Sequence, residues 1–206
     1  MQREREALYD VLAHAVIGHL AVVVDGVPLA LPTVFGVDLA GPDEGGTLYV
    51  HGSVASRSLV QGPAHDVSVT CTVLDGMVLA RSGFNHSMNY RSAVVIGRPR
   101  VVDDPDEKSH ALDLLVDHVV PGRAATLRRP TGKELAATTV LALPLHEASV
   151  KSRVGDPDDD EVDVAAGVWA GVVPLRTVAS TARTAADAAG LAVPEHVAAR
   201  VRDLRG

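Results

Sequence analysis

The chain has 206 residues, of which 47% are hydrophobic and 22% charged, and its formal net charge is -7. This length and composition suffice to bury one sizeable core with a small appendage. The acidic balance and the aromatic content of only 3% argue against a nucleic-acid partner, because the basic residues form no stripe interleaved with aromatics. The single cysteine, Cys71, excludes an intrachain disulfide, and no apolar run has the length of a membrane span. We therefore expect a cytoplasmic protein that acts neither on nucleic acid nor in a membrane.

The first half of the sequence predicts a helix followed by antiparallel strands. Apolar residues at helical spacing from Leu8 to Ala15 indicate the helix. Asp25-Gly26, set between apolar runs, predicts a tight hairpin turn. Asp75-Gly76 likewise predicts a turn into a partner strand that ends near Arg81. The strands expected in this half are residues 18–24, 27–35, 47–51 and 67–74.

The second half adds further strands and three helices. Pro105 and the acidic residues beside it favour the start of a helix that ends at Pro121-Gly122. A short capped helix is expected over 131–136, and a last helix begins at Pro194. The strands expected in this half are residues 92–102, 138–149 and 166–175.

Antiparallel hairpins with few helices predict a mainly β protein with peripheral α-helices, in which the strands form a barrel rather than a parallel sheet. After Leu175 the composition changes to alanine, arginine and threonine. We therefore expect a main domain over 1–175 and a helical appendage over 176–206. The sequence does not decide whether this appendage packs on the main domain or on a partner subunit.

The segment from His51 to Ser58 is the strongest functional pattern in the chain. A β-rich run ends at Gly52 and continues as Ser53-Val54-Ala55-Ser56-Arg57-Ser58. Free N–H groups and the dipole at a helix start favour an anion, and the Arg57 guanidinium can donate two parallel hydrogen bonds. A phosphate is the natural ligand of such a site. The alternative is that Ser53 caps a short helix while Arg57 is a solvated surface charge.

Other motifs fail on their spacing. Gly132-Lys133 lacks the serine or threonine that follows in a P-loop, and no G-x-G-x-x-G follows a strand. The acidic run over 156–163 lacks the glycine and the final glutamate of a calcium-binding loop, so we expect a solvated acidic loop. The nine histidines show no metal-binding spacing, and no metal site is predicted.

Several segments, in their order along the chain, carry a family resemblance. They are Pro32-Thr33-Val34-Phe35, the segment from His51 to Ser58, residues 67–73, residues 88–97, Pro121-Gly122-Arg123, residues 130–138 and residues 168–175. From about Arg5 to Leu175 the chain resembles the pyridoxamine-phosphate-oxidase-like FMN-binding split barrels, in particular the subfamily related to nitroimidazole reductases. The resemblance implies an antiparallel split β-barrel with flanking helices and a C-terminal helical tail. It also implies a homodimer with FMN in clefts between the subunits.

The resemblance further implies roles for particular residues. The FMN phosphate would be held by Ser53, Ser56, Arg57 and Ser58. Many relatives carry a lysine where Ser58 stands, so this chain has one cation fewer. The ring and ribityl chain would be lined by Thr33, Val34, Phe35, His51 and Gly52.

Three of the candidate residues have alternative roles. His51 exchanges a proton or hydrogen bond with the bound ring, or it is a structural hydrogen-bond partner. Trp169 contacts the cofactor, or it fills the core. Arg153 adds positive charge near the site, or it faces water.

The sequence therefore leads us to expect an FMN-dependent oxidoreductase that passes electrons from a reduced nicotinamide to a small acceptor such as a nitro compound. A helix from Pro194 stands where true pyridoxamine-phosphate oxidases have an Arg-Leu-x-Pro segment, so vitamin synthesis is not expected. The alternatives are a flavin- or haem-binding sensor or carrier without turnover, a deazaflavin-dependent reductase, and a scaffold that has lost its cofactor.

Overall fold

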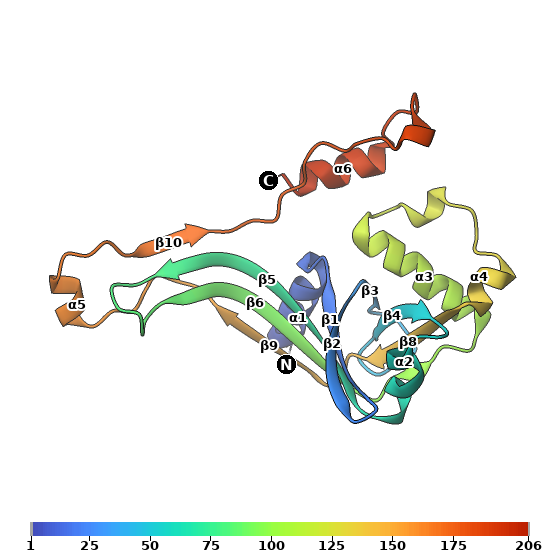
Figure 1. The fold of residues 1–206 in the computed structure, drawn as a ribbon, viewed down its shortest axis with the longest axis horizontal. Helices are drawn as coiled ribbons and strands as arrows, with labels where there is room; N and C mark the ends of the chain where they lie inside the picture. The colour runs from blue at the N-terminus through green and yellow to red at the C-terminus, as the bar shows by residue number, and fades with distance from the viewer. Residues whose placement is uncertain (1, 206) are drawn as a thin grey trace. The chain divides into compact units, whose positions relative to one another are not determined.

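Antiparallel strands with helices around them make up the computed structural model, which describes residues 2–205 (Figure 1). The chain divides into a first unit, residues 2–15, 71–93 and 149–177, and a second unit, residues 16–70, 94–148 and 178–205. The helices are α1 (Gln2–His14), α2 (Arg57–Gln61), α3 (Pro105–Val119), α4 (Gly132–Ala136), α5 (Glu161–Ala165) and α6 (Glu195–Asp203), with short 3₁₀ turns at Gly62–Ala64, Ala124–Thr126 and Ala186–Ala188. None of the described helices is both long and apolar enough to cross a membrane.

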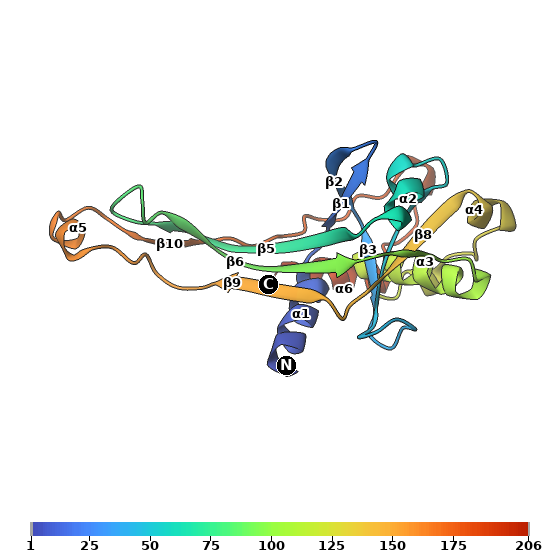
Figure 2. The same ribbon diagram turned by 90° about the horizontal axis from the view of Figure 1, so that it is seen from below.

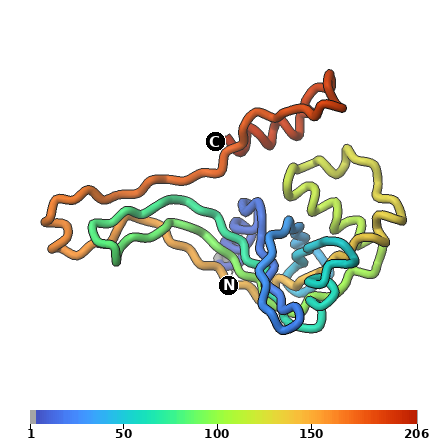
Figure 3. The backbone as a smooth tube through the Cα atoms, viewed as in Figure 1, coloured from blue at the N-terminus to red at the C-terminus, as the bar shows by residue number. Residues whose placement is uncertain are grey.

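The strands alternate with these helices along the chain. They are β1 (Gly18–Val24), β2 (Val27–Thr33), β3 (Phe35–Asp38), β4 (Thr47–Ser53), β5 (Val67–Leu79), β6 (Ser87–Gly97), β7 (Arg100–Val101), β8 (Thr138–Pro144), β9 (Ala148–Arg153) and β10 (Gly171–Pro174). The backbone trace in Figure 3 follows them from the N-terminal to the C-terminal colours.

The first unit is a sheet to which the N-terminal helix is joined by side-chain ion pairs. Its strands lie in the order β10-β5-β6-β9, and β5, β6 and β9 run side by side in Figure 2. Arg91 of β6 donates two hydrogen bonds of 3.0 Å to the carboxylate of Asp75 on β5. The same guanidinium also pairs with Asp10 of α1. One cation therefore connects two strands and the N-terminal helix.

The turn that we expected at Asp75-Gly76 is wrong, because β5 continues through both residues. The Asp75 carboxylate is occupied by Arg91 and does not stabilise a turn. A Cβ on Gly76 would lie 3.0 Å from Cγ1 of Val172 and 3.3 Å from the carbonyl oxygen of Val173. The glycine therefore allows β10 to approach β5 closely.

The solvated loop expected over 156–163 is also wrong in part. Residues Glu161–Ala165 form α5, and the Asp159 side chain is only 1% exposed. Its carboxylate accepts hydrogen bonds of 2.9 Å from the backbone N–H and from Nη1 of Arg81. A buried ion pair, rather than water, satisfies this carboxylate.

The second unit begins with the expected hairpin. β1 and β2 pair from Gly18 opposite Thr33 to Val24 opposite Val27. Asp25 and Gly26, at the turn, have φ angles of 50° and 78°, the positive values that a two-residue hairpin turn requires. The expected hairpin and its turn are confirmed.

The other sheet of this unit has the strand order β3-β4-β8-β7 and is covered by α3. The Asp104 carboxylate caps α3 by accepting from the N–H groups of Asp106 and Glu107. A Cβ on Gly36 would lie 3.0 Å from Cβ of Leu114, so the glycine lets the helix lie close to β3. The shared core contains Tyr49, Val102, Ala111, Val140 and Ala142.

Arg100 of β7 joins this sheet to α3 through a half-buried network. Its Nε and Nη2 donate to the Asp43 carboxylate at 2.9 and 2.8 Å, and its Nη1 donates to Glu107 at 3.0 Å. The Tyr49 hydroxyl donates to the same Glu107 carboxylate at 3.0 Å. Hydrogen bonds from Arg100 hold the pKa values of Asp43 and Glu107 below their usual range, and burial raises the pKa of Tyr49 to about 12.

We predict that Arg100→Met lowers the free energy of unfolding by about 2 to 4 kcal/mol at pH 7, because two largely buried carboxylates lose their cation. Both carboxyls have lowered pKa values in the fold, so their contribution is present above pH 4 or so and is lost as the pH falls. Urea unfolding followed by circular dichroism measures the loss, which should shrink in acid.

The matched control for this prediction is Arg98→Met. Arg98 is 61% exposed and lies 3.6 Å from an exposed Asp66, so its loss should cost less than about 0.5 kcal/mol. Equal losses in the two variants would contradict a special role for Arg100.

Candidate functional site

The end of β4 carries the candidate phosphate segment. β4 pairs with β8, and the register places His51 opposite Val140 and Ser53 opposite Thr138. α2 begins four residues after the strand ends, at Arg57. The strand-to-helix connection that the sequence predicted is therefore present.

Gly52 is required where α2 returns against the strand. A Cβ at this position would lie 2.7 Å from Cδ1 of Leu59, a buried side chain on α2. A larger residue would push the helix away from β4. The glycine therefore allows α2 to pack closely against the end of β4.

The connection leaves two backbone donors free. The N–H groups of Ala55 and Ser56 bond back to Ser53, and those of Leu59 and Val60 bond to the carbonyl of Ser56. Within residues 2–205, no acceptor lies against the N–H groups of Arg57 and Ser58. These are the first two N–H groups of the helix. A bound anion would accept hydrogen bonds from them.

Hydroxyl groups surround these donors. Ser56, rather than Ser53, is the N-cap residue of α2, and its side chain makes no capping bond. Its Oγ lies 2.9 Å from Oγ of Ser58, whose side chain is largely buried. Ser53 accepts from Ala55 at 3.2 Å and stays exposed. The structure therefore brings the three serines together and leaves Ser53 and Ser56 accessible.

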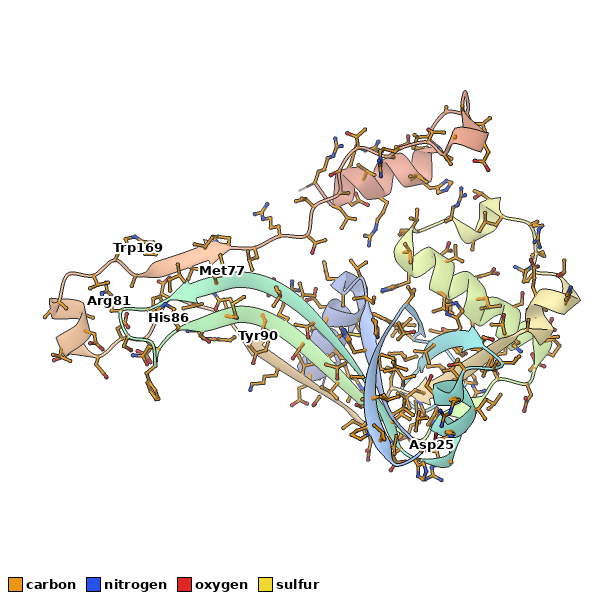
Figure 4. All side chains as sticks on the ribbon, in the orientation of Figure 1. Asp25, Met77, Arg81, His86, Tyr90 and Trp169 are labelled. Atoms are coloured by element: carbon orange, nitrogen blue, oxygen red, sulfur yellow. The ribbon has the colours of Figure 1, made fainter. Side chains whose placement is uncertain are left out.

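Arg57 is already paired in this structure. Its guanidinium lies against the carboxylate of Asp25 in the β1–β2 turn, and both side chains are more than half exposed. Gln61, at the other end of α2, donates to Oδ1 of Asp25 at 2.8 Å and accepts from its N–H at 3.0 Å. Figure 4 shows Asp25 beside α2. Asp25 thus holds both ends of the helix, and sequence reasoning missed it because the partners are more than thirty residues apart.

His51 lies one residue before the glycine. The protein around the strand end lowers the pKa of its imidazole by partial desolvation, although the residue is exposed by surface area. The ring is therefore neutral at physiological pH, with one nitrogen that donates and one that accepts. It has the chemistry to exchange a hydrogen bond or a proton with a ligand at this edge.

The second predicted segment lies beside His51. Phe35 is paired with Val50, which brings Thr33 and Val34 to the same end of β4. Phe35 itself is fully buried, and its ring centroid lies 4.2 Å from that of His118. The Phe35 side chain therefore belongs to the core, whereas the Thr33 hydroxyl donates to the carbonyl of Val34 at 3.0 Å.

Arg153 and Trp169 belong to the first unit, whereas the candidates described above belong to the second. Arg153 Nη1 donates to Oδ1 of the buried Asn89 at 2.6 Å, and the Arg153 side chain is half-buried. Trp169 is 66% exposed, so it does not fill the core. Figure 4 shows its side chain beside β5, near Arg81 and Met77.

Comparison with known proteins places these features in a family. The family model described as pyridoxamine 5'-phosphate oxidase matches residues 4–152. The chain belongs to this family. No curated protein matches the chain in sequence. Membership confirms the resemblance seen in the sequence and the mainly antiparallel fold with peripheral helices.

Solved structures extend the similarity beyond the family model. An FAD- and haem-binding protein of Mycobacterium smegmatis is 43% identical, with a TM-score of 0.84 and coverage of 98% of this chain and 95% of its own. A flavocytochrome of Azotobacter vinelandii is 34% identical, with a TM-score of 0.83 and coverage of 97% and 89%. A Bacteroides thetaiotaomicron protein whose name refers to 5-nitroimidazole resistance is 21% identical, with a TM-score of 0.55 and coverage of 70% and 81%, and shares the fold alone.

We predict that His51→Gln flattens the pH dependence of stability below about pH 6.5. A histidine whose pKa is lowered on folding binds fewer protons in the native state than in the unfolded one. Stability therefore rises with pH across this window, and the rise should be small because solvent screens the exposed imidazole. Urea unfolding between pH 5 and 7 compares the slopes, with the exposed His146→Gln as a control for removing a histidine. Parallel slopes for wild type and His51→Gln would contradict a lowered pKa of this imidazole.

Proposed function

We propose that this protein is a flavin- and haem-binding oxidoreductase that accepts electrons from a reduced nicotinamide and passes them to a small acceptor. The observation that carries the flavin part is the pair of unbonded N–H groups of Arg57 and Ser58 beside the Arg57 guanidinium. Similarity over nearly the whole chain to two proteins whose names include haem or flavocytochrome supports the haem part.

The residues at this turn fit a phosphate group. The two N–H groups donate from the helix start, and the hydroxyls of Ser53 and Ser56 lie within the same connection. Arg57 adds charge-assisted hydrogen bonds once its side chain leaves Asp25. The exchange costs little, because an exposed ion pair is worth about 0 to 1 kcal/mol.

The flavin itself is the second element of the proposal. The sequence favoured FMN, whereas the relative that is 43% identical is named for FAD and haem. The turn at Arg57 recognises a phosphate that both flavins contain. We favour FAD because the similarity to that relative covers the region beyond residue 152 as well as the family domain.

His51 would act on the ring end of the flavin. The flavin supplies the hydride and electron transfer, while the protein positions it and provides proton exchange. His51 lies in β4 two residues before the strand ends, and Val34 and Thr33 lie at the same end of that strand. A neutral imidazole there can donate to or accept from a bound ring. The homodimer, the nicotinamide donor and the small acceptor stay predictions.

The phosphate site predicts two variants with opposite effects. Arg57→Ala should weaken flavin binding by about 10- to 100-fold, because charge-assisted hydrogen bonds worth about 1.5 to 3 kcal/mol are lost. Asp25→Asn should strengthen binding by up to about fivefold, because Arg57 loses its competing partner. Asparagine also tolerates the positive φ at this turn. Titration of apo protein with FMN and with FAD, followed by flavin fluorescence, measures both; changes of the same sign would refute the site.

A cofactor analysis tests the function as a whole. Protein purified with a haem precursor in the medium should show flavin absorption and a Soret band, and reduced nicotinamide should bleach the flavin under anaerobic conditions. Heat-released flavin, separated by chromatography, should be FAD. Flavin without a Soret band would remove haem from the proposal, and no flavin at all would refute it.

A further inference from the structure

A cavity of about 400 Å³ in the second unit is lined by α3, the 3₁₀ turn at Ala124–Thr126 and the segment that leads into α4. Its floor is apolar. Leu112 and Val116 lie one turn apart on α3 and share the floor with Pro130 and with Leu127, whose side chain is 44% exposed. The volume lies within the range of about 300 to 1,000 Å³ that small-molecule sites occupy. The floor therefore offers contact to an apolar or aromatic face of a ligand.

Paired ions form another part of the lining. Arg128 donates to both carboxylate oxygens of Glu134, at 2.8 and 2.5 Å, in a bidentate pair. Arg129 donates to the carboxylate of Asp113 at 2.5 Å. The charges of these four side chains balance. A neutral ligand with polar groups therefore suits the cavity better than a free phosphate does.

A purine base combines the features that this lining selects. Its aromatic face can stack on the planar guanidinium of Arg128, while the apolar floor covers the ring. Arg129 donates to one oxygen of Asp113, and an ionised carboxylate has about four lone pairs. Asp113 can therefore still accept a hydrogen bond from an exocyclic amino group such as that of adenine. The lining fits an adenosine group.

The phosphate turn (residues 53–58) is attached to the same short helix that carries Glu134. The N–H of Val54 in this turn donates to the carbonyl of Ala137, the C-cap residue of α4, at 3.1 Å. The hydroxyl of Thr138, the next residue, donates to the carbonyl of Glu134 at 2.9 Å. α4 packs against both α3 and β8 (Figure 1). Three residues separate Glu134 from Ala137, about 4.5 Å along a helix, so the cavity and the turn are neighbours within one unit.

FAD has an adenosine group beyond the phosphate that it shares with FMN. We propose that the cavity between α3 and α4 binds the adenosine half of FAD, while the phosphate turn holds the phosphate on the flavin side. This inference rests on the proposed function, because it requires a flavin at that turn. It assigns the preference for FAD over FMN to the cavity. A nicotinamide dinucleotide also contains adenosine, and the test separates the two sources.

The test titrates apo protein with FAD and with FMN and compares the two affinities. We expect wild type to bind FAD about tenfold more tightly than FMN or better. Arg128→Ala removes the stacking plane, and Val116→Trp fills the cavity. Each should lower the affinity for FAD about tenfold and leave that for FMN within about twofold. Since FMN has no adenosine group, its unchanged affinity also shows that the variant is folded.

Arg202→Ala is the matched control, because Arg202 is paired and similarly exposed but does not line the cavity. It should change neither affinity. Should Val116→Trp fail to fold, Arg128→Ala still provides the test, because its side chain is 69% exposed.

The outcomes separate this inference from the proposed function. Equal affinities of wild type for FAD and FMN, or an unchanged ratio in the folded variants, would overturn the inference and leave a flavoprotein. Weaker binding of NAD⁺ to FMN-loaded Arg128→Ala, with an unchanged ratio of flavin affinities, would overturn it by assigning the cavity to the nicotinamide dinucleotide. Wild type that binds neither flavin would refute the proposed function and the inference with it.

Discussion

The packing of α3 on the sheet of the second unit depends on the hydrogen bonds of Arg100. This guanidinium takes one carboxylate from the loop before β4 and one from the first turn of α3, and Tyr49 on β4 adds a hydroxyl to the second carboxylate. The network therefore fixes α3 across the sheet at one end of the helix. The other end of α3 carries Val119, to which α6 is bonded, and β4 leads directly to the phosphate turn. The candidate phosphate turn therefore follows a strand that this one cation helps to align.

The sequence predicted the local parts of this arrangement well. The β1–β2 hairpin and the Asp-Gly turn within it depend on neighbours in the chain, as do the Asp104 cap of α3 and the Thr131 capping box of α4. Each of these features is specified by residues within one or two turns of backbone. Their physical cause can therefore be seen without knowing the rest of the fold.

The errors share a different cause. Asp75-Gly76 has the composition of a turn, but Arg91 takes the carboxylate and β10 takes the space above the glycine. Asp159 lies in an acidic run, but Arg81, far away in the sequence, removes it from water. The pairing of Arg57 with Asp25 of the β1–β2 turn was likewise not foreseen, although it leaves the predicted role of Arg57 untouched. In each case a distant partner of opposite charge or a close approach of another backbone segment determined the local structure. Neither can be recognised from the local sequence.

The candidate site was visible in outline for the same reason. The strand, the glycine and the serines are consecutive, so the phosphate turn could be recognised from the sequence, and the pairing of β3 with β4 adds Thr33 and Val34. The contact of α6 with the end of α3 could not be foreseen, since it joins Arg200 to Val119, which is distant in the sequence.

The pairing of Arg57 with Asp25 means that the phosphate turn carries its own counterion. Without ligand the pair is close to electrically neutral, so the turn exerts only a weak attraction on the chloride and small anions of a cell. A bound phosphate would replace one internal anion by another, and few salt ions would be released to the solvent. Occupancy of such a turn would change little with ionic strength, in contrast to a surface that binds phosphate through unpaired cations.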